Sequence, residues 1–279
     1  MGLLRFLVLG SSLLAGCPSV PLNAPSVMAG YTVAGPAGTM LGPGTFSLSA
    51  VCPAGKLAVG GGWSSSTNLA TQMSTSAPLP GGRGWTVTAS NANPIIGLFL
   101  RPFAICVDPL AGYTITSPGG SLQSQEVKSF EAVCPSNTHV VTGGGISAAS
   151  GEVIPFSQGI VGQPAPERYR AGGRSIALLP GSSGFAPLAI CADFTQVPGR
   201  EILLSPSVSA GPLSSASLQV DCPNNKVVLH GAVLSLDSGL RVIQSHPVNG
   251  GPSWTATIYN PILGAPMSGR LQVVCANAP

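Results

Sequence analysis

The residues best suited to chemistry in this chain are a lysine and three glycines in the stretch CPAGKLAVGGGW, residues 52–63. A glycine-rich loop with a lysine can hold a phosphate through its backbone N–H groups, but such a loop reads G-x-x-x-x-G-K-[ST] and opens a helix. Here Lys56 precedes the glycines, and no helical pattern of apolar residues follows Trp63. The stretch therefore does not predict a phosphate-binding loop.

The other reactive side chains form no catalytic pattern. The chain has nine carboxylates, and none recurs as a pair that would serve acid–base chemistry. The three histidines, at 139, 230 and 246, lack metal-ligand spacing, and no G-x-S-x-G nucleophile motif is present. We therefore predict no catalytic residue, no metal and no cofactor.

Three cations stand at one repeated position, four residues before a glycine block: Lys56, His139 and Lys226. Gathered around one axis, they would form a positive ring able to attract an anionic sugar or a phosphate. The alternative is three solvated residues at the starts of strands. We carry both interpretations forward.

A second polar group lies in residues 155–174, PFSQGIVGQPAPERYRAGGR, which we interpret as a loop specific to the middle of the chain. It combines an acid, an aromatic residue and three arginines: Glu167, Arg168, Tyr169, Arg170 and Arg174. A site present only once in the chain is expected here. The alternative is a solvated insertion.

The glycine block belongs to an internal repeat of about 85 residues. CPSNTHVVTGGGIS begins at Cys134 and CPNNKVVLHGAVLS at Cys222, which predicts copies at 27–108, 109–196 and 197–279. Aligned, the block gives three columns: Gly60, Gly143 and His230; Gly61, Gly144 and Gly231; Gly62, Gly145 and Ala232. Small residues there predict close packing of another backbone, or less favourably of a ligand. We expect Gly144→Val to destabilise the fold by more than about 1 kcal/mol. Because Ala232 is tolerated in the third column, we expect Gly62→Ala to be milder than Gly144→Val.

Short alternating runs between Gly, Pro, Asn and Ser clusters predict an all-β chain. In GWTVTASN and SWTATIYN, Trp85 and Trp254 fall on the apolar parity and are expected in the core, whereas the supposed counterpart in the second copy, RSIALLPG, has no tryptophan. Three copies joined by short connections predict a pseudo-threefold, β-prism-like arrangement. The alternative is three consecutive β-sandwich modules.

Seven cysteines are present, two in each copy plus Cys17. Both cysteines of a copy fall on the inward parity of their strands, and six cysteines allow 15 pairings. The repeat selects one of them: Cys52–Cys106, Cys134–Cys191 and Cys222–Cys275. Paired cysteines indicate an oxidising compartment.

The N-terminal stretch MGLLRFLVLGSSLLAGC has the form of an export signal, and its end, Leu14 to Cys17, resembles the bacterial lipobox. The resemblance implies that residues 1–16 are removed and that Cys17 carries the lipid, with residues 17–26 as a short tether. It places the protein in the bacterial cell envelope, lipid-anchored and outside the cytoplasm.

The pattern CPxGK…GGG…GW…C over residues 27–279 resembles a β-repeat of bacterial secreted and surface proteins, a resemblance that implies no particular activity. With a net charge of +3 and no basic cluster, we do not expect nucleic acid as a partner. We predict a non-enzymatic surface lipoprotein that binds or adheres to a glycan or an envelope protein. The alternatives are a self-associating subunit of a coat or filament, and a hydrolase with its site in residues 155–174.

Overall fold

The computed structural model describes residues 27–66, 71–95, 97–149, 153–162, 166–178, 180–235, 237–248 and 250–279. These residues form strands with two short 3-10 turns, at Pro80–Gly82 and Phe194–Gln196. The prediction of an all-β fold is confirmed. Cys17 and the signal segment lie outside the described residues.

Within the described residues, each of the three predicted copies (27–108, 109–196 and 197–279) contains seven strands. In the first they are β1 (Thr32–Ala34), β2 (Thr39–Leu41), β3 (Gly44–Val51), β4 (Leu57–Ser65), β5 (Thr71–Pro78), β6 (Gly84–Asn91) and β7 (Leu98–Val107). In the second they are β8 (Thr114–Thr116), β9 (Ser121–Gln123), β10 (Val127–Val133), β11 (His139–Ala148), β12 (Val153–Val161), β13 (Arg168–Ser175) and β14 (Ser182–Asp193). In the third they are β15 (Glu201–Leu204), β16 (Val208–Ala210), β17 (Ser215–Asp221), β18 (Lys226–Ser235), β19 (Arg241–Val248), β20 (Ser253–Tyr259) and β21 (Met267–Asn277).

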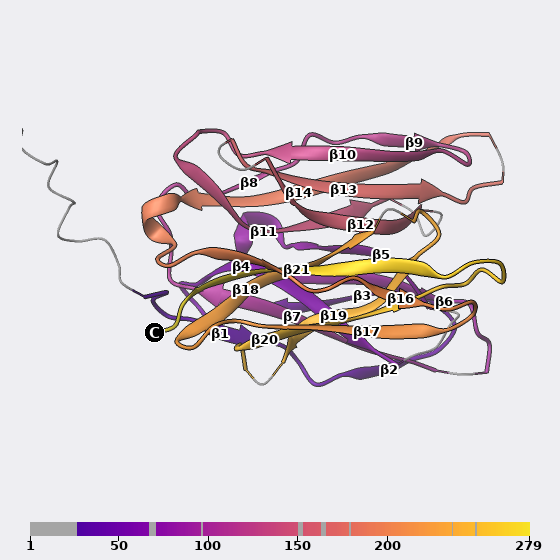
Figure 1. Cartoon of the computed structure of the whole chain (residues 1–279), viewed down its shortest axis with the longest axis horizontal. Coiled ribbons are helices and arrows are strands. Elements are labelled where there is room, and N and C mark those ends of the chain that lie inside the picture. The colour runs from indigo at the N-terminus through magenta and orange to yellow at the C-terminus, as the bar shows by residue number, and fades with distance from the viewer. Residues whose placement is uncertain are drawn as a thin grey trace, which may run out of the picture.

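The strand pairing within a copy is the same three times. The long last strand, β7, pairs with β1, β2 and β4, while β6 lies between β3 and β5. The second copy repeats this with β14 and β13, and the third with β21 and β20. Every pair is antiparallel, and the strands run along the long axis of the molecule (Figure 1).

The copies share sheets with one another. β5 of the first copy pairs with β11 of the second at Ser76 and Ile146, and β4 pairs with β19 of the third at Trp63 and Ser245. At the remaining junction, β12 of the second copy lies beside β18 of the third without a backbone ladder between them. The alternative of three separate sandwiches does not fit sheets built from two copies.

The disulfides of the structure are the predicted ones, Cys52–Cys106, Cys134–Cys191 and Cys222–Cys275. Each joins the residue directly after the third strand of a copy to the last strand of the same copy. Closing a loop of 53 to 57 residues restricts the unfolded chain, which stabilises the fold by about 4 kcal/mol per bridge in the chain-entropy description. Three such bridges are what an oxidising, extracytoplasmic compartment permits.

Candidate functional site

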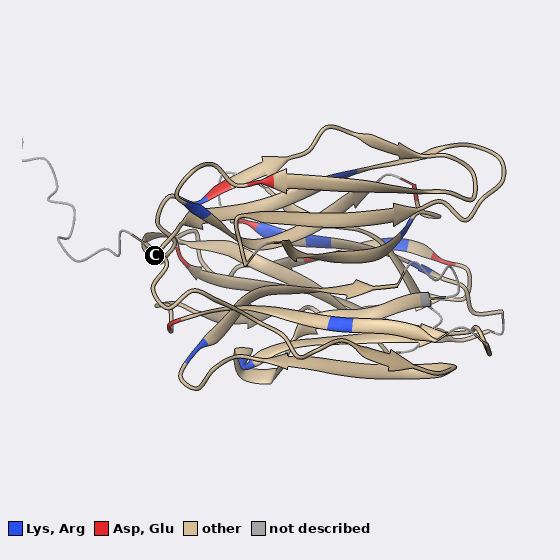
Figure 2. Cartoon of the chain, turned by 90° about the horizontal axis from the view of Figure 1, so that it is seen from below, with Lys and Arg blue, Asp and Glu red and all other residues tan. Residues whose placement is uncertain are grey.

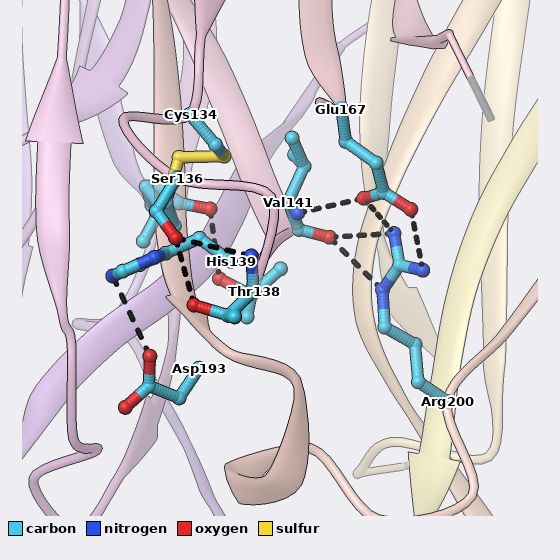
Figure 3. Close-up of a disulfide and its surroundings, with 11 residues drawn as sticks. Cys134, Ser136, Thr138, His139, Val141, Glu167, Asp193 and Arg200 are labelled. Atoms are coloured by element: carbon cyan, nitrogen blue, oxygen red, sulfur yellow. Dashed lines mark hydrogen bonds and ion pairs between the residues drawn. A yellow bond between two sulfur atoms is a disulfide. The ribbon is translucent and has the colours of Figure 1, made fainter. Parts of the chain in front are cut away.

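The cations of the expected ring are each neutralised within their own copy. Lys56 Nζ lies 2.9 Å from Asp108 Oδ1, His139 Nε2 lies 3.6 Å from Asp193 Oδ1, and Lys226 pairs with Glu201. Figure 3 shows the pair in the second copy. A paired cation attracts an anion weakly, so these residues do not form the free positive ring that the sequence suggested.

The glycine blocks meet at the centre of the molecule, where β4, β11 and β18 approach one another. A Cβ at Gly60 would lie 3.1 Å from the Cβ of His230, and one at Gly143 would lie 3.2 Å from both Gly60 Cα and that same histidine Cβ. These contacts leave no room for side chains in two of the three copies. The interpretation of the block as backbone packing is confirmed.

The middle glycine of each block lies beneath an aromatic ring of its own copy. A Cβ at Gly61 would enter the ring of Trp85, and one at Gly144 the ring of Tyr169; at Gly231 it would enter the ring of Trp254. The counterpart of the two tryptophans in the second copy is therefore Tyr169 on β13. The alignment of that copy through RSIALLPG was wrong, because it placed the strand six residues too late along the chain.

His230 fills the space between these three rings. Its ring centroid lies 6.1 Å from that of Trp85, 5.7 Å from Tyr169 and 5.9 Å from Trp254. The Tyr169 hydroxyl is 3.2 Å from Nε2 of the histidine. Burial lowers the pKa of His230 to about 3, so the imidazole is neutral at physiological pH. This centre is a packed core, closed to a ligand from solution.

Residues 155–174 are not a loop specific to the second copy. They belong to the hairpin of β12 and β13, the counterpart of β5–β6 and β19–β20. Tyr169 is fully buried, while Arg168 and Arg170 project outward and both donate to Glu131. Arg174 lies one residue before the end of β13. The hydrolase hypothesis loses the irregular loop on which it depended.

Glu167, predicted within that loop, instead forms a buried ion pair between copies. Arg200 Nη2 donates to its Oε2 at 2.6 Å, and the Val141 backbone N–H donates to the same oxygen at 2.8 Å (Figure 3). Both side chains are only 6% exposed. Tyr31 and Tyr113 occupy the place of Arg200 in the other copies, where their hydroxyls donate to Val228 and Ala58 carbonyls. Sequence reasoning missed this pair because its members lie in different copies.

The third glycine column explains why one junction has no ladder. A Cβ at Gly62 would collide with the backbone carbonyl of Ser245, and one at Gly145 with that of Ser76. The third copy carries Ala232 in this column, so its methyl group occupies the space that a neighbouring backbone takes elsewhere. No backbone pair therefore forms between β12 and β18, although the two strands lie against each other.

A glutamine side chain supplies hydrogen bonds between β21 and β12, across the junction that has no backbone pair. Gln272 is buried and reaches across to β12, where its Oε1 accepts from the Ile160 N–H at 2.6 Å and its Nε2 donates to the Ile160 carbonyl at 3.2 Å. Farther along, the Ser235 N–H donates to Ser157 Oγ at 3.2 Å. Gly159 permits this bridge, because a Cβ there would lie 2.5 Å from Leu234 Cδ2 and 2.9 Å from the glutamine oxygen.

The junction of β12 and β18 has no backbone pair, and we call it the open junction. Beside the Gln272 bridge it forms a groove of about 560 Å³. We call it the junction groove. Its walls combine four serines, one carboxylate, two guanidinium groups and apolar residues: Ser157, Val161, Arg170, Ser207, Leu234, Ser235, Asp237, Ser268, Gly269 and Arg270. Of the residues proposed from the sequence, only Arg170 lines it. Arg270 forms no ion pair with any described residue, so its positive charge is available to a ligand.

Neither the known family models nor the curated proteins contain a match to this chain. In the part of the chain that the structure describes, no three or more His, Cys, Asp or Glu side chains gather as metal ligands would. The same residues include no helix long and apolar enough to cross a membrane.

Proposed function

We propose that this protein is a non-enzymatic surface lipoprotein of the bacterial envelope that binds an anionic glycan in the junction groove. The observation that carries the proposal is the groove itself. Its volume of about 560 Å³ suits an oligosaccharide segment, since ligand sites commonly span several hundred Å³. Serine hydroxyls and backbone groups match sugar hydroxyls, and guanidinium groups match a carboxylate.

The groove holds two arginines and the Asp237 carboxylate, whose Oδ2 accepts from the Ser268 N–H. Arg170 shares its charge with Glu131, 2.8 Å from Nε, whereas Arg270 is exposed and has no carboxylate partner among the described residues. An acidic sugar would complete the pairing of Arg270 at the rim, while Leu234 and Val161 would pack against the apolar face of the sugar ring. A neutral sugar would gain the hydroxyl contacts and the apolar contacts, but not the ion pair with Arg270.

The location of the protein at the cell surface rests on the three disulfides and on the lipobox resemblance at Cys17. A lipid chain on Cys17 anchors the protein, with the tether of residues 18–26 leading to the described domain. The substitution Cys17→Ser should move the protein from the membrane fraction to the soluble fraction. Continued membrane retention of the variant, or a mature N-terminus at another residue, would contradict this part of the proposal.

Ligand binding is tested by calorimetric titration with trigalacturonic acid and with its methyl ester, which has the same ring and no charge. We expect the acid to bind at least about tenfold more tightly, with an affinity that falls as salt increases, because a surface charge pair is screened. Equal affinity for the acid and the ester, or binding to neither across a panel of acidic oligosaccharides, would contradict the proposed ligand class.

A further inference from the structure

Three equivalent turns, one in each copy, hold aliphatic side chains out in water. They connect the sixth strand to the seventh and read NPIIG at 93–97, IALLPG at 176–181 and NPILG at 260–264. Ile95 is 90% exposed, Leu178 is 89% exposed and Leu263 is 76% exposed. Isolated exposed apolar residues are common, but the same exposed aliphatic tip in three copies is a pattern that calls for a partner.

The three tips lie at the same end of the molecule. Strands β7, β14 and β21 each begin after a tip and run the length of the molecule to the opposite end (Figure 1). At that opposite end the described chain begins, where the Met28 N–H donates to the Asn277 carbonyl. We call it the near end, and the end that carries the tips the far end.

In the first and the third of these turns, an asparagine side chain fixes the backbone. Asn93 Oδ1 accepts from the Ile95 N–H at 2.9 Å, and Asn260 Oδ1 accepts from the Ile262 N–H at 2.9 Å. Such side-chain turns preset the local conformation. In these two turns the conformation is therefore set before any partner arrives, which reduces the entropy lost on docking.

In each copy an arginine lies on a strand at the far end and forms no ion pair, although Arg101 Nε donates to the Pro36 carbonyl and Arg241 Nε is buried. Arg101 follows the first tip on β7, Arg174 precedes the second on β13, and Arg241 lies opposite Tyr259, just before the third. None of these arginines forms an ion pair with a described residue, whereas the near end holds the pairs Lys56–Asp108, Lys226–Glu201 and Arg200–Glu167. Figure 2 shows how sparse charged residues are on the ribbon as a whole.

We infer that the far end docks on an anionic phospholipid bilayer, with the aliphatic tips at the acyl boundary and the neighbouring guanidinium groups on lipid phosphates. Separate protrusions enter a fluid surface independently, while a protein partner would need three matching pockets. Aliphatic insertion combined with cationic contacts is the general basis of peripheral membrane binding. The inference does not depend on the junction groove.

The position of the tips is tested with a tryptophan reporter. Trp63, Trp85 and Trp254 are buried, so a tryptophan introduced at Leu178 is the one reached by a quencher in a bilayer. The full-length Leu178→Trp protein is held in phosphatidylcholine vesicles and mixed with phosphatidylglycerol vesicles that contain brominated lipid. The matched control is Val51→Trp, because Val51 is a 66% exposed aliphatic residue at the near end.

We expect a blue shift and quenching for Leu178→Trp only. Quenching of both reporters, or of the Val51 reporter alone, would overturn the inference. A blue shift that depends on protein concentration and occurs without brominated-lipid quenching would indicate a protein contact at the tips and would also overturn it. A protein that fails to anchor in the phosphatidylcholine vesicles can still be quenched by the brominated lipid of the phosphatidylglycerol vesicles. Failure of the proposed Cys17 anchor is therefore distinguishable from failure of docking through the tips.

A loss-of-binding pair completes the test. The double variant Leu178→Ser, Leu263→Ser should lower the affinity for phosphatidylglycerol vesicles by about tenfold or more, since each buried aliphatic side chain contributes a factor of that order. Val51→Ser should leave the affinity unchanged. Unchanged affinity of the double variant, with its melting temperature preserved, would contradict docking through the tips.

Discussion

At the scale of single residues, the glycine block acts through the space it leaves for others. Gly144 lies beneath the ring of Tyr169, and its backbone needs no positive φ. A side chain there is disfavoured by collision with a fully buried aromatic ring, which cannot move without disturbing His230 and Gln158. Steric exclusion, rather than chain flexibility, explains why this column is glycine in every copy.

We expect Gly144→Val to lower the free energy of unfolding by about 2 kcal/mol or more, as overpacking of a closed core does. The structure removes the reason for expecting Gly62→Ala to be milder than Gly144→Val. Its Cβ would meet the Ser245 backbone, a contact that Ala232 avoids at the open junction. Chemical denaturation measures the free energy of unfolding of both variants and of the parent protein. Stability of Gly144→Val equal to that of the parent protein would contradict the packing, as would a mild effect of Gly62→Ala.

His230 makes the stability of the fold dependent on pH. Burial lowers its pKa to about 3, whereas in the unfolded chain it titrates near 6.5. Between these values the unfolded chain binds more protons, so the stabilising contribution is complete above pH 6.5 and is lost as the pH falls towards 3. The free energy of unfolding should drop by up to about 1.4 kcal/mol per pH unit in this window.

Denaturation curves from pH 7 to pH 4 measure that slope. The variant His230→Gln removes the titrating group and should show a slope smaller by up to one proton. His246→Gln is the control, because that imidazole is only partly buried and its pKa is lowered less completely by burial. An unchanged slope in His230→Gln would show that the imidazole is not held neutral as described.

At the scale of elements, the open junction follows from two substitutions in one block. The third copy replaces Gly-Gly-Gly with His230-Gly231-Ala232, and β12 forms no backbone pair with β18, whereas each of the other junctions has one. The variant Ala232→Gly should let the two strands approach, so that the backbone amides from 157 to 160 exchange hydrogen more slowly. Hydrogen-exchange mass spectrometry measures this. Faster or unchanged exchange would show that the methyl group does not hold the junction open.

The sequence predicts much of this element structure. The repeat, the strand parity and the disulfide pairing all follow from local periodicity, because each cysteine or tryptophan reports the inward face of its own strand. The second copy was misaligned at Tyr169, since an aromatic residue inside RYRAGGRS reads as part of a polar loop. Local pattern carries no information about which strand of another copy lies alongside.

At the scale of the whole molecule, the groove was beyond reach of the sequence for the same reason. Its walls come from β12 and β13 of one copy and from β18 and β21 of the next. Of the groove residues, only Arg170 was predicted as a site residue, and it was assigned to a loop rather than to strand β13. The copies differ in structure where they meet, through the bridge of Gln272 and the pair of Arg200 with Glu167.

The central claim is that the open junction binds an anionic glycan and that the closed junctions do not. The most direct test compares Arg270→Gln with Arg101→Gln, because Arg101 occupies the same strand position in the first copy, beside the closed β4–β19 junction. Calorimetric titration with trigalacturonic acid should show about a tenfold weaker affinity for Arg270→Gln. Arg101→Gln should bind as tightly as the parent protein. Equal affinities for the two variants would contradict the account.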